Sequence, residues 1–354
     1  VSGVWVTPTI VSGPLRRPSL ARNAPPGVKI SGMEASHAGP GGSAPVHSII
    51  GGVRVAGAGG ERETLSPATG LQLGACSLLD ESQAQSAVES TVKAFPAWRS
   101  TSLTDRARIL DRARALILAE SDALAELVAR EQGKPLAEAL LAEVLPPLDH
   151  LKHIADTAAD TLAPTDVSPE VLLVGHKQAR LEWAPYGPVL IITPWNYPFS
   201  IPVTGIAAAL MAGNTVVLKP APATTLIGLA IGDLFTRAGL PAGVLNTVAC
   251  DDTVAAALVQ DPRFRKILFT GSVPTGRRIM ASASAQGTPV TLELGGKDPA
   301  VVCADADIER AASGIVWAAF LNAGQTCASV ERVYVEEKIA DAFIARVIEK
   351  TKAL

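Results

Sequence analysis

The chain has 354 residues, of which 48% are hydrophobic, and its formal net charge at pH 7 is −3. This length indicates roughly two domains, with enough apolar side chains for a sizeable core. The near-balanced charge gives no reason to expect nucleic acid as a partner. No apolar run reaches the ~18 residues that a membrane span needs, so we expect no membrane partner either.

Residues 1–48 differ in composition from the rest of the chain, because they are rich in Gly, Pro, Ser and Ala and have weak periodicity. We predict a disordered tail there. Up to Met33 this stretch contains basic residues and no acidic residue, which leaves a transit peptide open as an alternative. The chain begins with Val1, and Met33 is an alternative start.

The sequence contains four cysteines, which are far apart and form no C-x-x-C pair: Cys76, Cys250, Cys303 and Cys327. This pattern argues against a zinc site and a disulfide framework, and it favours a reducing cytoplasm. His150 and His153 are spaced like metal ligands but have no cysteine or carboxylate at ligand spacing. We therefore expect an ordinary helix surface there and no metal.

A short segment with the residue pattern of a strand and a turn precedes a long stretch with helical periodicity. Val53 and Val55 alternate as in a short strand, and the stretch 65–70 is typical of a turn. One long helix is predicted from Asp105 to Gln132. A second helix is expected over Leu136–Val144, a break at Pro146-Pro147, and a third helix from Leu148 to Asp160.

From Pro188 onward, short apolar runs alternate with helical ones. The predicted strands are Val189–Thr193, Thr215–Leu218, Val244–Val248, Lys266–Phe269, Val290–Glu293 and Ala300–Val302. The predicted helices between them are Thr204–Met211, Thr225–Ala238, Thr253–Gln260 and Gly276–Ala285. This alternation predicts an α/β fold with a parallel, Rossmann-like sheet covered by helices on both faces. Ligands of such sheets bind at the carboxyl ends of the strands.

Two motifs at predicted strand ends have the chemistry of phosphate and ribose binding. The turn from Gly271 to Gly276 follows a strand and opens a helix, whose N-terminus attracts negative charge. Its spacing is not G-x-G-x-x-G, so an ordinary strand–helix turn is an alternative. Lys219 directly follows a buried strand and could donate to ribose hydroxyls or phosphates; a solvated lysine is the alternative.

Three further motifs have the chemistry of acyl transfer. Asn196 lies in the proline- and ring-rich loop 193–199, where its amide could stabilise an oxyanion, unless the loop is only structural. Glu293 stands among apolar residues, which would raise its pKa and suit it as a general base. Cys327 follows small, flexible residues and could be a reactive thiolate, although a buried inert cysteine is commoner. Cys303 ends an apolar run, which predicts a buried, inert thiol.

Taken together, these motifs resemble the aldehyde dehydrogenase superfamily. The resemblance covers Ile49 to Leu354 and rests on the order of the stretches P-W-N-Y-P-F, G-N-T-V-V-L-K-P, F-T-G-S, L-E-L-G-G-K and G-Q-T-C. It implies that Cys327 attacks an aldehyde, and that the Asn196 side chain and the Cys327 amide hold the oxyanion. It also implies that Glu293 activates the water that hydrolyses the thioester. The implied reaction oxidises a small-molecule aldehyde to a carboxylic acid with NAD or NADP, through a cysteine thiohemiacetal and a thioester.

The resemblance also assigns the cofactor contacts. Lys219 would contact the ribose, and Trp195 would line the same cleft. The pyrophosphate would face Gly271, Ser272 and Gly276, and Leu294 would lie near the nicotinamide. Pro222 stands where many relatives have a glutamate that repels a 2′-phosphate, so we expect NADP to be used at least comparably to NAD.

The implied domain organisation places N-terminal helices and the NAD(P)-binding domain in residues 49–294. Residues 295–354 would begin a second α/β catalytic domain, which we interpret as incomplete. The full-length protein is then expected to be a homo-oligomer. In residues 1–354 alone we expect an inactive fragment whose last helix exposes Ile339, Phe343 and Val347.

Two other functions stay open. A CoA-acylating relative would end the reaction by thiol transfer, but such relatives usually lack the glutamate that Glu293 provides here. A catalytically inactive fragment that only binds nucleotide is the second alternative. The sequence does not identify the aldehyde.

Overall fold

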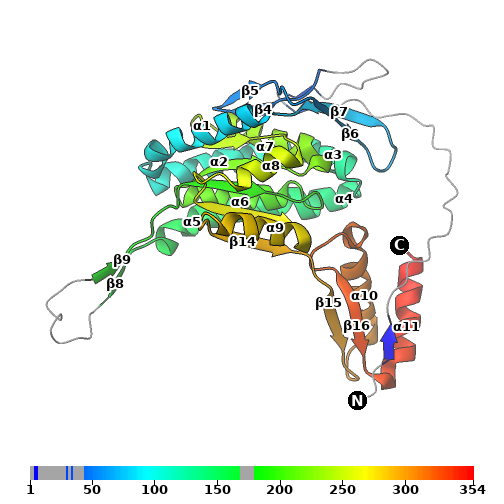
Figure 1. Cartoon of the computed structure of the whole chain (residues 1–354). Helices are drawn as coiled ribbons and strands as arrows, with labels where there is room; N and C mark the ends of the chain where they lie inside the picture. Colours follow the sequence, from blue (N-terminus) through cyan, green and yellow to red (C-terminus); the bar gives the residue numbers. More distant parts are fainter. Residues whose placement is uncertain (1–3, 7–28, 31–32, 35–43, 168–178) are drawn as a thin grey trace. The chain divides into compact units, whose positions relative to one another are not determined.

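The computed structural model describes residues 4–6, 29–30, 33–34, 44–167 and 179–354 (Figure 1). Most of the tail predicted over residues 1–48 lies outside the described residues. The chain divides into two compact units. The large unit is Gly27–Glu293, and the small unit combines Leu294–Leu354 with Val1–Pro26.

A seven-stranded sheet forms the centre of the large unit, in the order β14-β13-β10-β11-β12-β4-β5. Its strands are β4 (Ser48–Ile50), β5 (Val53–Val55), β10 (Pro188–Ile192), β11 (Thr215–Lys219), β12 (Leu245–Thr247), β13 (Lys266–Gly271) and β14 (Val290–Leu294). The contiguous strands β13, β10, β11 and β12 are parallel, and β4 and β5 extend the sheet in antiparallel fashion. The prediction of a parallel α/β sheet is therefore confirmed.

Nine α-helices in the described part of the large unit pack around this sheet. They are α1 (Glu81–Arg99), α2 (Leu103–Ala119), α3 (Ser121–Gln132), α4 (Leu136–Ala139), α5 (Leu145–Thr161), α6 (Ser200–Met211), α7 (Thr225–Arg237), α8 (Asp252–Val259) and α9 (Val273–Ser284). The helices α6 and α7 connect β10 to β11 and β11 to β12, so right-handed crossovers place both on one face of the sheet. The helices α8 and α9 return toward β14 and cover the other face. No helix in the described ranges is long and apolar enough to cross a membrane.

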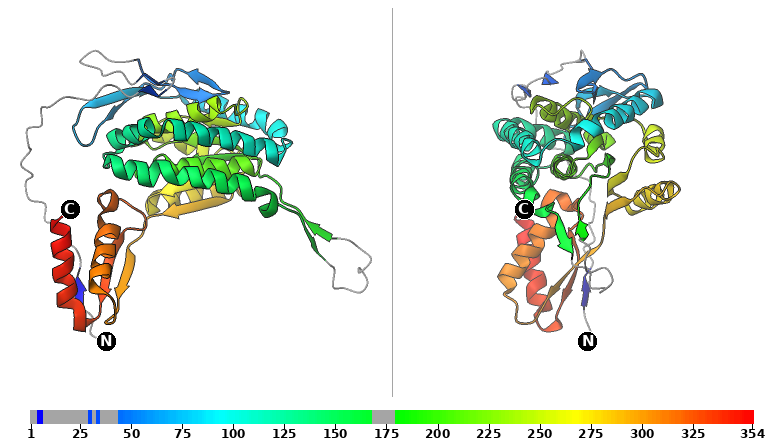
Figure 2. Two further views of the ribbon diagram at one scale, coloured as in Figure 1. Left: turned by 180° about the vertical axis from the view of Figure 1, so that it is seen from behind. Right: turned by 90° about the vertical axis from the view of Figure 1, so that its left-hand side faces the viewer.

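Three two-stranded sheets complete the large unit. They are β2–β3 (Lys29–Ile30 and Met33–Glu34), β6–β7 (Glu61–Leu65 and Gln72–Ser77) and β8–β9 (Thr165–Val167 and Ala179–Leu181). The strands β8 and β9 project away from the helices of this unit, as both Figure 1 and Figure 2 show. The turn predicted over residues 65–70 joins β6 to β7.

The helical segments before residue 162 differ from the prediction in three respects. The expected helix Asp105–Gln132 is interrupted at Glu120, whose backbone leaves the helical region and whose carboxylate binds Arg237. The prolines Pro146 and Pro147 do not interrupt the helical structure, because they occupy the first turn of α5, where a missing N–H costs little. The helix α1 was not predicted, since its buried residues include two alanines and a threonine and Pro96 lies inside it.

The small unit is a three-stranded sheet with two helices. Its strands are ordered β1-β16-β15, with bounds Val4–Val6, Val330–Val335 and Asp298–Val302, and its helices are α10 (Ile308–Phe320) and α11 (Glu337–Lys352). The strands β15 and β16 are parallel, and β1 adds to β16 in antiparallel orientation. Val302 and Val335 are buried against the two helices, whereas Val301, which points to the other face, is 72% exposed.

The prediction that the last helix exposes its apolar face is wrong. Phe343 is buried in a cluster with Val302 and Val335, and Ile339 and Val347 pack against that cluster. The reason is that α10 lies beside α11 and, with the sheet, covers this face.

Candidate active site

Three loops leave neighbouring parallel strands at the carboxyl edge of the large unit's sheet. The register pairs Ile192 of β10 with Lys219 of β11 on one side and with Phe269 of β13 on the other. The amide of Thr193 also donates to the carbonyl oxygen of Lys219 at 3.2 Å. The loops that contain Asn196, Lys219 and the Gly271–Gly276 turn therefore begin side by side.

Lys219 is not a solvated lysine at a strand end, because its side chain is only 7% exposed. It is the last residue of β11, a strand buried along its whole length. Its Nζ lies 3.8 Å from Oδ1 of Asp252, an exposed residue in the first turn of α8. A buried ammonium with a carboxylate on one side is suited to bind hydroxyl or phosphate oxygens.

The Gly271–Gly276 turn joins β13 to α9. Ser272 is the N-cap residue of α9, and its hydroxyl accepts a hydrogen bond from the amide of Thr275. A side chain at Gly271 would place its Cβ 2.6 Å from the ring of Phe269, so the ring would have to shift to admit any larger residue. Gly276 is buried in the first turn. The helix N-terminus carries a partial positive charge that favours an anion.

The loop that contains Asn196 is anchored by buried residues. Pro194, Pro198 and Phe199 are buried, whereas Trp195 is 45% exposed and Asn196 is half-buried. Two buried charged residues that the sequence analysis missed, Lys134 and Glu143, make direct contacts with this loop. No local motif marks them, because their partners in this loop are more than fifty residues away along the chain.

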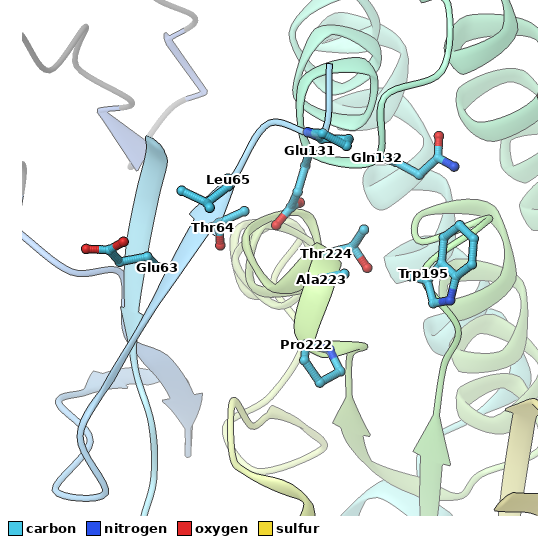
Figure 3. A pocket seen from close by; sticks show the side chains of 10 residues that line it. Glu63, Thr64, Leu65, Glu131, Gln132, Trp195, Pro222, Ala223 and Thr224 are labelled. Carbon is cyan, nitrogen blue, oxygen red and sulfur yellow. The ribbon is translucent and has the colours of Figure 1, made fainter. Parts of the chain in front are cut away.

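A pocket of about 330 Å³ opens at the same edge of the sheet. Trp195 lies on one side of it and Thr64 and Leu65 on the other, with Pro222 and Thr224 between (Figure 3). Its remaining lining residues are Glu63, Pro67, Glu131, Gln132 and Ala223. Two of the residues predicted to bind a cofactor, Trp195 and Pro222, therefore share one concave surface.

Several buried polar atoms around this pocket have no hydrogen-bond partner among the residues that the structure describes. They are the hydroxyls of Thr64 and Thr224 and both amide atoms of Gln132. The buried hydroxyl of Thr193, at the start of the Asn196 loop, likewise has no hydrogen-bond partner among the described residues. Because buried polar groups are nearly always satisfied, these atoms are available for hydrogen bonds to water or to a polar ligand.

Glu131 is a second charged residue that the sequence analysis missed at this edge. Its carboxylate is buried and accepts hydrogen bonds from the amides of Leu226 at 2.7 Å and Ile227 at 2.9 Å, in the first turn of α7. Burial raises the pKa of Glu131 to about 8. The signal was present, because Glu131 follows Leu124, Leu127 and Val128 at i+7, i+4 and i+3, on the apolar face of α3.

Glu293 and Leu294 lie at the end of β14, where the large unit meets the small unit in sequence. The expectation that apolar residues enclose the Glu293 carboxylate is wrong, because the side chain is exposed. The physical reason is that β14 is an edge strand, and the alternation of its side chains turns Glu293 outward between the half-buried Leu292 and Leu294.

Cys327 belongs to the small unit and is exposed in the turn before β16. Asn322, Ala323 and Gly324 precede it with φ values of 53°, 56° and 75°. The left-handed conformation costs a residue other than glycine about 1 kcal/mol or more. Strain of this kind is concentrated at functional sites. Here two hydrogen bonds stabilise the strained turn: the side-chain amide of Asn322 donates to the backbone oxygen of Gln325, and the side-chain amide of Gln325 donates to the backbone oxygen of Asn322.

The other cysteines differ in accessibility. Cys76 and Cys250 are buried, and burial raises the pKa of Cys250 to about 11. The prediction that Cys303 is buried is wrong: it lies just beyond β15 and is exposed. Two thiols among the described residues, Cys303 and Cys327, are therefore open to solvent, and both are in the small unit.

Comparison with known proteins identifies relatives along most of the chain. The model of the aldehyde dehydrogenase family matches residues 55–354. Betaine aldehyde dehydrogenase of Vibrio vulnificus is 38% identical over 309 residues, which are 86% of this chain and 62% of the relative.

Solved structures give the same result. The NADP-dependent glyceraldehyde-3-phosphate dehydrogenase of Bacillus halodurans, in complex with NADP, matches with a TM-score of 0.84 and 33% identity over 88% of this chain and 66% of its own. The NAD-dependent aldehyde dehydrogenase of Sinorhizobium meliloti matches with a TM-score of 0.83 and 33% identity over 87% of this chain and 62% of its own. The chain thus spans less than two thirds of each of these relatives. It belongs to the aldehyde dehydrogenase family.

Proposed function

We propose that the whole protein oxidises a small-molecule aldehyde to a carboxylic acid with NAD⁺ or NADP⁺. The observation that supports this most is the register that starts the loops of Asn196, Lys219 and Gly271–Gly276 on adjacent parallel strands. In this proposal the large unit is the cofactor domain, and the small unit begins the catalytic domain with Cys327.

The residues at the sheet edge fit a dinucleotide. The buried ammonium of Lys219 would donate to ribose hydroxyls, and Ser272 with the first turn of α9, from Gly271 to Gly276, would hold the pyrophosphate. The orphaned hydroxyls of Thr193 and Thr224 provide further polar partners beside Trp195 and Pro222. Leu294 is proposed to lie near the nicotinamide.

The chemistry that the protein's own residues perform follows from their types. The Cys327 thiolate forms a bond to the aldehyde carbon, and the carbonyl oxygen becomes an oxyanion that accepts from the Asn196 side chain and the Cys327 amide. When bound, the nicotinamide supplies an acceptor for the hydride that leaves this carbon. Glu293 then takes a proton from a water molecule that attacks the resulting thioester, which releases the acid and the Cys327 thiol.

An assay of the whole protein tests this function. With a panel of aldehydes, absorbance at 340 nm should rise with NAD⁺ or NADP⁺, and the product should be the free acid. Formation of an acyl-CoA that requires added CoA would favour the acylating alternative instead. Nucleotide binding without turnover of any aldehyde would favour a binding protein.

We propose that the whole protein forms a homo-oligomer. Large apolar side chains are exposed on and beside the β8–β9 hairpin: Val167, Leu181, Trp183 and Tyr186. Exposed apolar groups of this kind mark interaction surfaces. Light scattering after size-exclusion chromatography should show an oligomer in the wild type, and Leu181→Asp should shift it toward the monomer.

We also propose that the protein works in a reducing compartment such as the cytoplasm. The mechanism requires a free thiol at Cys327, and all four cysteines are unpaired in the structure. A disulfide between the accessible Cys303 and Cys327 of two molecules would block it. Maleimide labelling of both residues in intact cells should find them reduced.

A further inference from the structure

We propose that Lys134 and Glu143 are positioning residues, which fix the loop that contains Asn196 through one buried ion pair. This inference rests on the proposed role of Asn196 in holding the oxyanion. Both side chains are fully inaccessible to solvent, and Lys134 Nζ lies 2.6 Å from Glu143 Oε1. Neither residue is proposed to touch the substrate or the cofactor.

Lys134 directs its ammonium at the Asn196 segment. Nζ donates to the backbone oxygen of Asn196 at 2.9 Å and lies 4.2 Å from the centre of the Tyr197 ring. Together with Glu143, the ammonium therefore has two hydrogen-bond acceptors and one aromatic ring around it. A cation over an aromatic face is favourable, and more so when it is desolvated. The peptide group that follows Asn196 is thus held by a charge.

Glu143 fastens the other end of the same segment. Its Oε2 accepts from the amide of Phe199 at 3.1 Å and from that of Ser200 at 2.9 Å, where α6 begins. These amides belong to the first helical turn and have no partner within the helix. One ion pair therefore binds residues 196, 197, 199 and 200, which leaves the intervening backbone little freedom to rotate.

The local backbone brings Glu143 to this position. It lies in the π-helical turn Leu140–Val144, which is inserted between α4 and α5. Such turns are rare, and they often occur at functional sites because they redirect a side chain. Lys134 follows Gly133, which ends α3 in the left-handed conformation with φ 91°. Two irregularities of the backbone thus place the two charges against one loop.

The energetics favour a role in orientation over one in stability. Burial lowers the pKa of Lys134 and raises that of Glu143, and each charge partly offsets this effect on the other. A buried ion pair often stabilises a fold no more than apolar residues would. Its hydrogen bonds are directional, however, and an oxyanion donor displaced by about 1 Å costs roughly a hundredfold in rate.

The first test compares turnover in four variants of the whole protein. Lys134→Met should lower kcat by about tenfold to a hundredfold, while KM for the aldehyde and Kd for NADH and NADPH change little. Lys152→Met is the matched control, because Lys152 forms an exposed ion pair with Asp156 on α5. In the Asn196→Ala background, Lys134→Met should cause no further loss, since both changes then affect one interaction.

The second measurement needs no catalytic activity. Hydrogen–deuterium exchange of residues 195–200 should be faster in Lys134→Met, and also in the isosteric Glu143→Gln variant if Lys134→Met fails to fold. Lys152→Met should leave it unchanged. A wild type without turnover would contradict the proposed function, whereas exchange would still decide whether the ion pair holds this loop. Unchanged kcat and exchange, or equal losses with and without Asn196, would overturn the inference.

Discussion

The Nζ atom of Lys219 lies 3.8 Å from Oδ1 of Asp252. Pro222 carries no charge, and Asp252 places a carboxylate at the proposed ribose site. A 2′-phosphate bound about 4 Å from this exposed carboxylate would be repelled by about 1 kcal/mol. Asp252 should therefore disfavour a 2′-phosphate, although Pro222 leaves room for one.

Replacing this carboxylate should shift the choice of cofactor. We expect Asp252→Asn to strengthen NADPH binding relative to NADH by about fivefold, which corresponds to about 1 kcal/mol. Pro222→Glu should shift the ratio in the opposite direction. Fluorescence titration gives both dissociation constants, and Asp160→Asn, an exposed position on α5, is the control. An equal change for NADH and NADPH in Asp252→Asn would contradict this role.

The wild type should still use NADP at least comparably to NAD, because the Asp252 side chain is 94% exposed, so that water and salt screen its charge, and Pro222 carries no charge. The measurement is kcat/KM for both cofactors with the same aldehyde. A preference for NAD of about a hundredfold, or about 2.7 kcal/mol, would show that this prediction is wrong. It would also indicate that Asp252 has a larger effect than one carboxylate at the surface should have.

An experiment can distinguish the proposed nucleophile Cys327 from Cys303, the other exposed cysteine. We expect Cys327→Ser to abolish aldehyde oxidation in the whole protein while nucleotide binding persists, because a serine hydroxyl stays protonated near neutral pH and is a much weaker nucleophile than a thiolate. Cys303→Ser is a close control, since Cys303 is also exposed and lies in the same unit. Peptide mapping after iodoacetamide treatment should show that alkylation of Cys327 tracks the loss of activity. Turnover that survives in Cys327→Ser and disappears in Cys303→Ser would reverse the assignment.

The proposed base affects only the second half of the reaction. Glu293→Gln should leave a burst of NAD(P)H and a slow steady state, because the thioester forms but water is no longer activated. Stopped-flow absorbance at 340 nm resolves the two phases. Glu61→Gln, an exposed position on β6, should keep both. If burst and steady state fall in equal proportion in Glu293→Gln, the residue does not act in deacylation.

The parallel sheet was predictable because its strands are short apolar runs bounded by Gly, Pro and helical segments. The predicted Val189–Thr193 is shifted by one residue at each end from β10, and the predicted Thr215–Leu218 is one residue shorter than β11. The helix α1 escaped prediction because the residues it buries include Ala84 and Ala87, so its hydrophobic contrast is small. The interruption at Glu120 depends on Arg237, a partner that no local pattern identifies.

Loops and motifs identified the candidate residues, but not their surroundings. The exposure of Cys303 and of Glu293 depends on which strand lies at an edge and where a strand ends, which local hydrophobicity does not specify. Lys134 and Glu143 were missed because their contacts with residues 196–200 are long-range. A charged residue on the apolar face of a predicted helix, as at Glu131, is a usable signal for such groups.

Glu131 itself should make stability depend on pH. Burial raises its pKa to about 8, against the opposing effect of the two amides of α7 that donate to it. An unfolded chain would titrate this group near its ordinary value of 4.5. Between these two values the folded protein holds a proton that the unfolded chain has released.

The sign of the effect follows from this difference in bound protons. The contribution of Glu131 is fully present below about pH 4.5 and is lost as the pH rises toward 8, by up to about 1.4 kcal/mol per pH unit. Glu131→Gln removes the titration, so the unfolding free energy of the wild type minus that of this variant should fall between pH 5 and pH 8. Denaturation in urea at four pH values measures it, and Glu126→Gln, a more exposed position on the same helix, should run parallel to the wild type. A constant difference across this range would mean that Glu131 is ionised in the folded protein and that its two amide donors outweigh its burial.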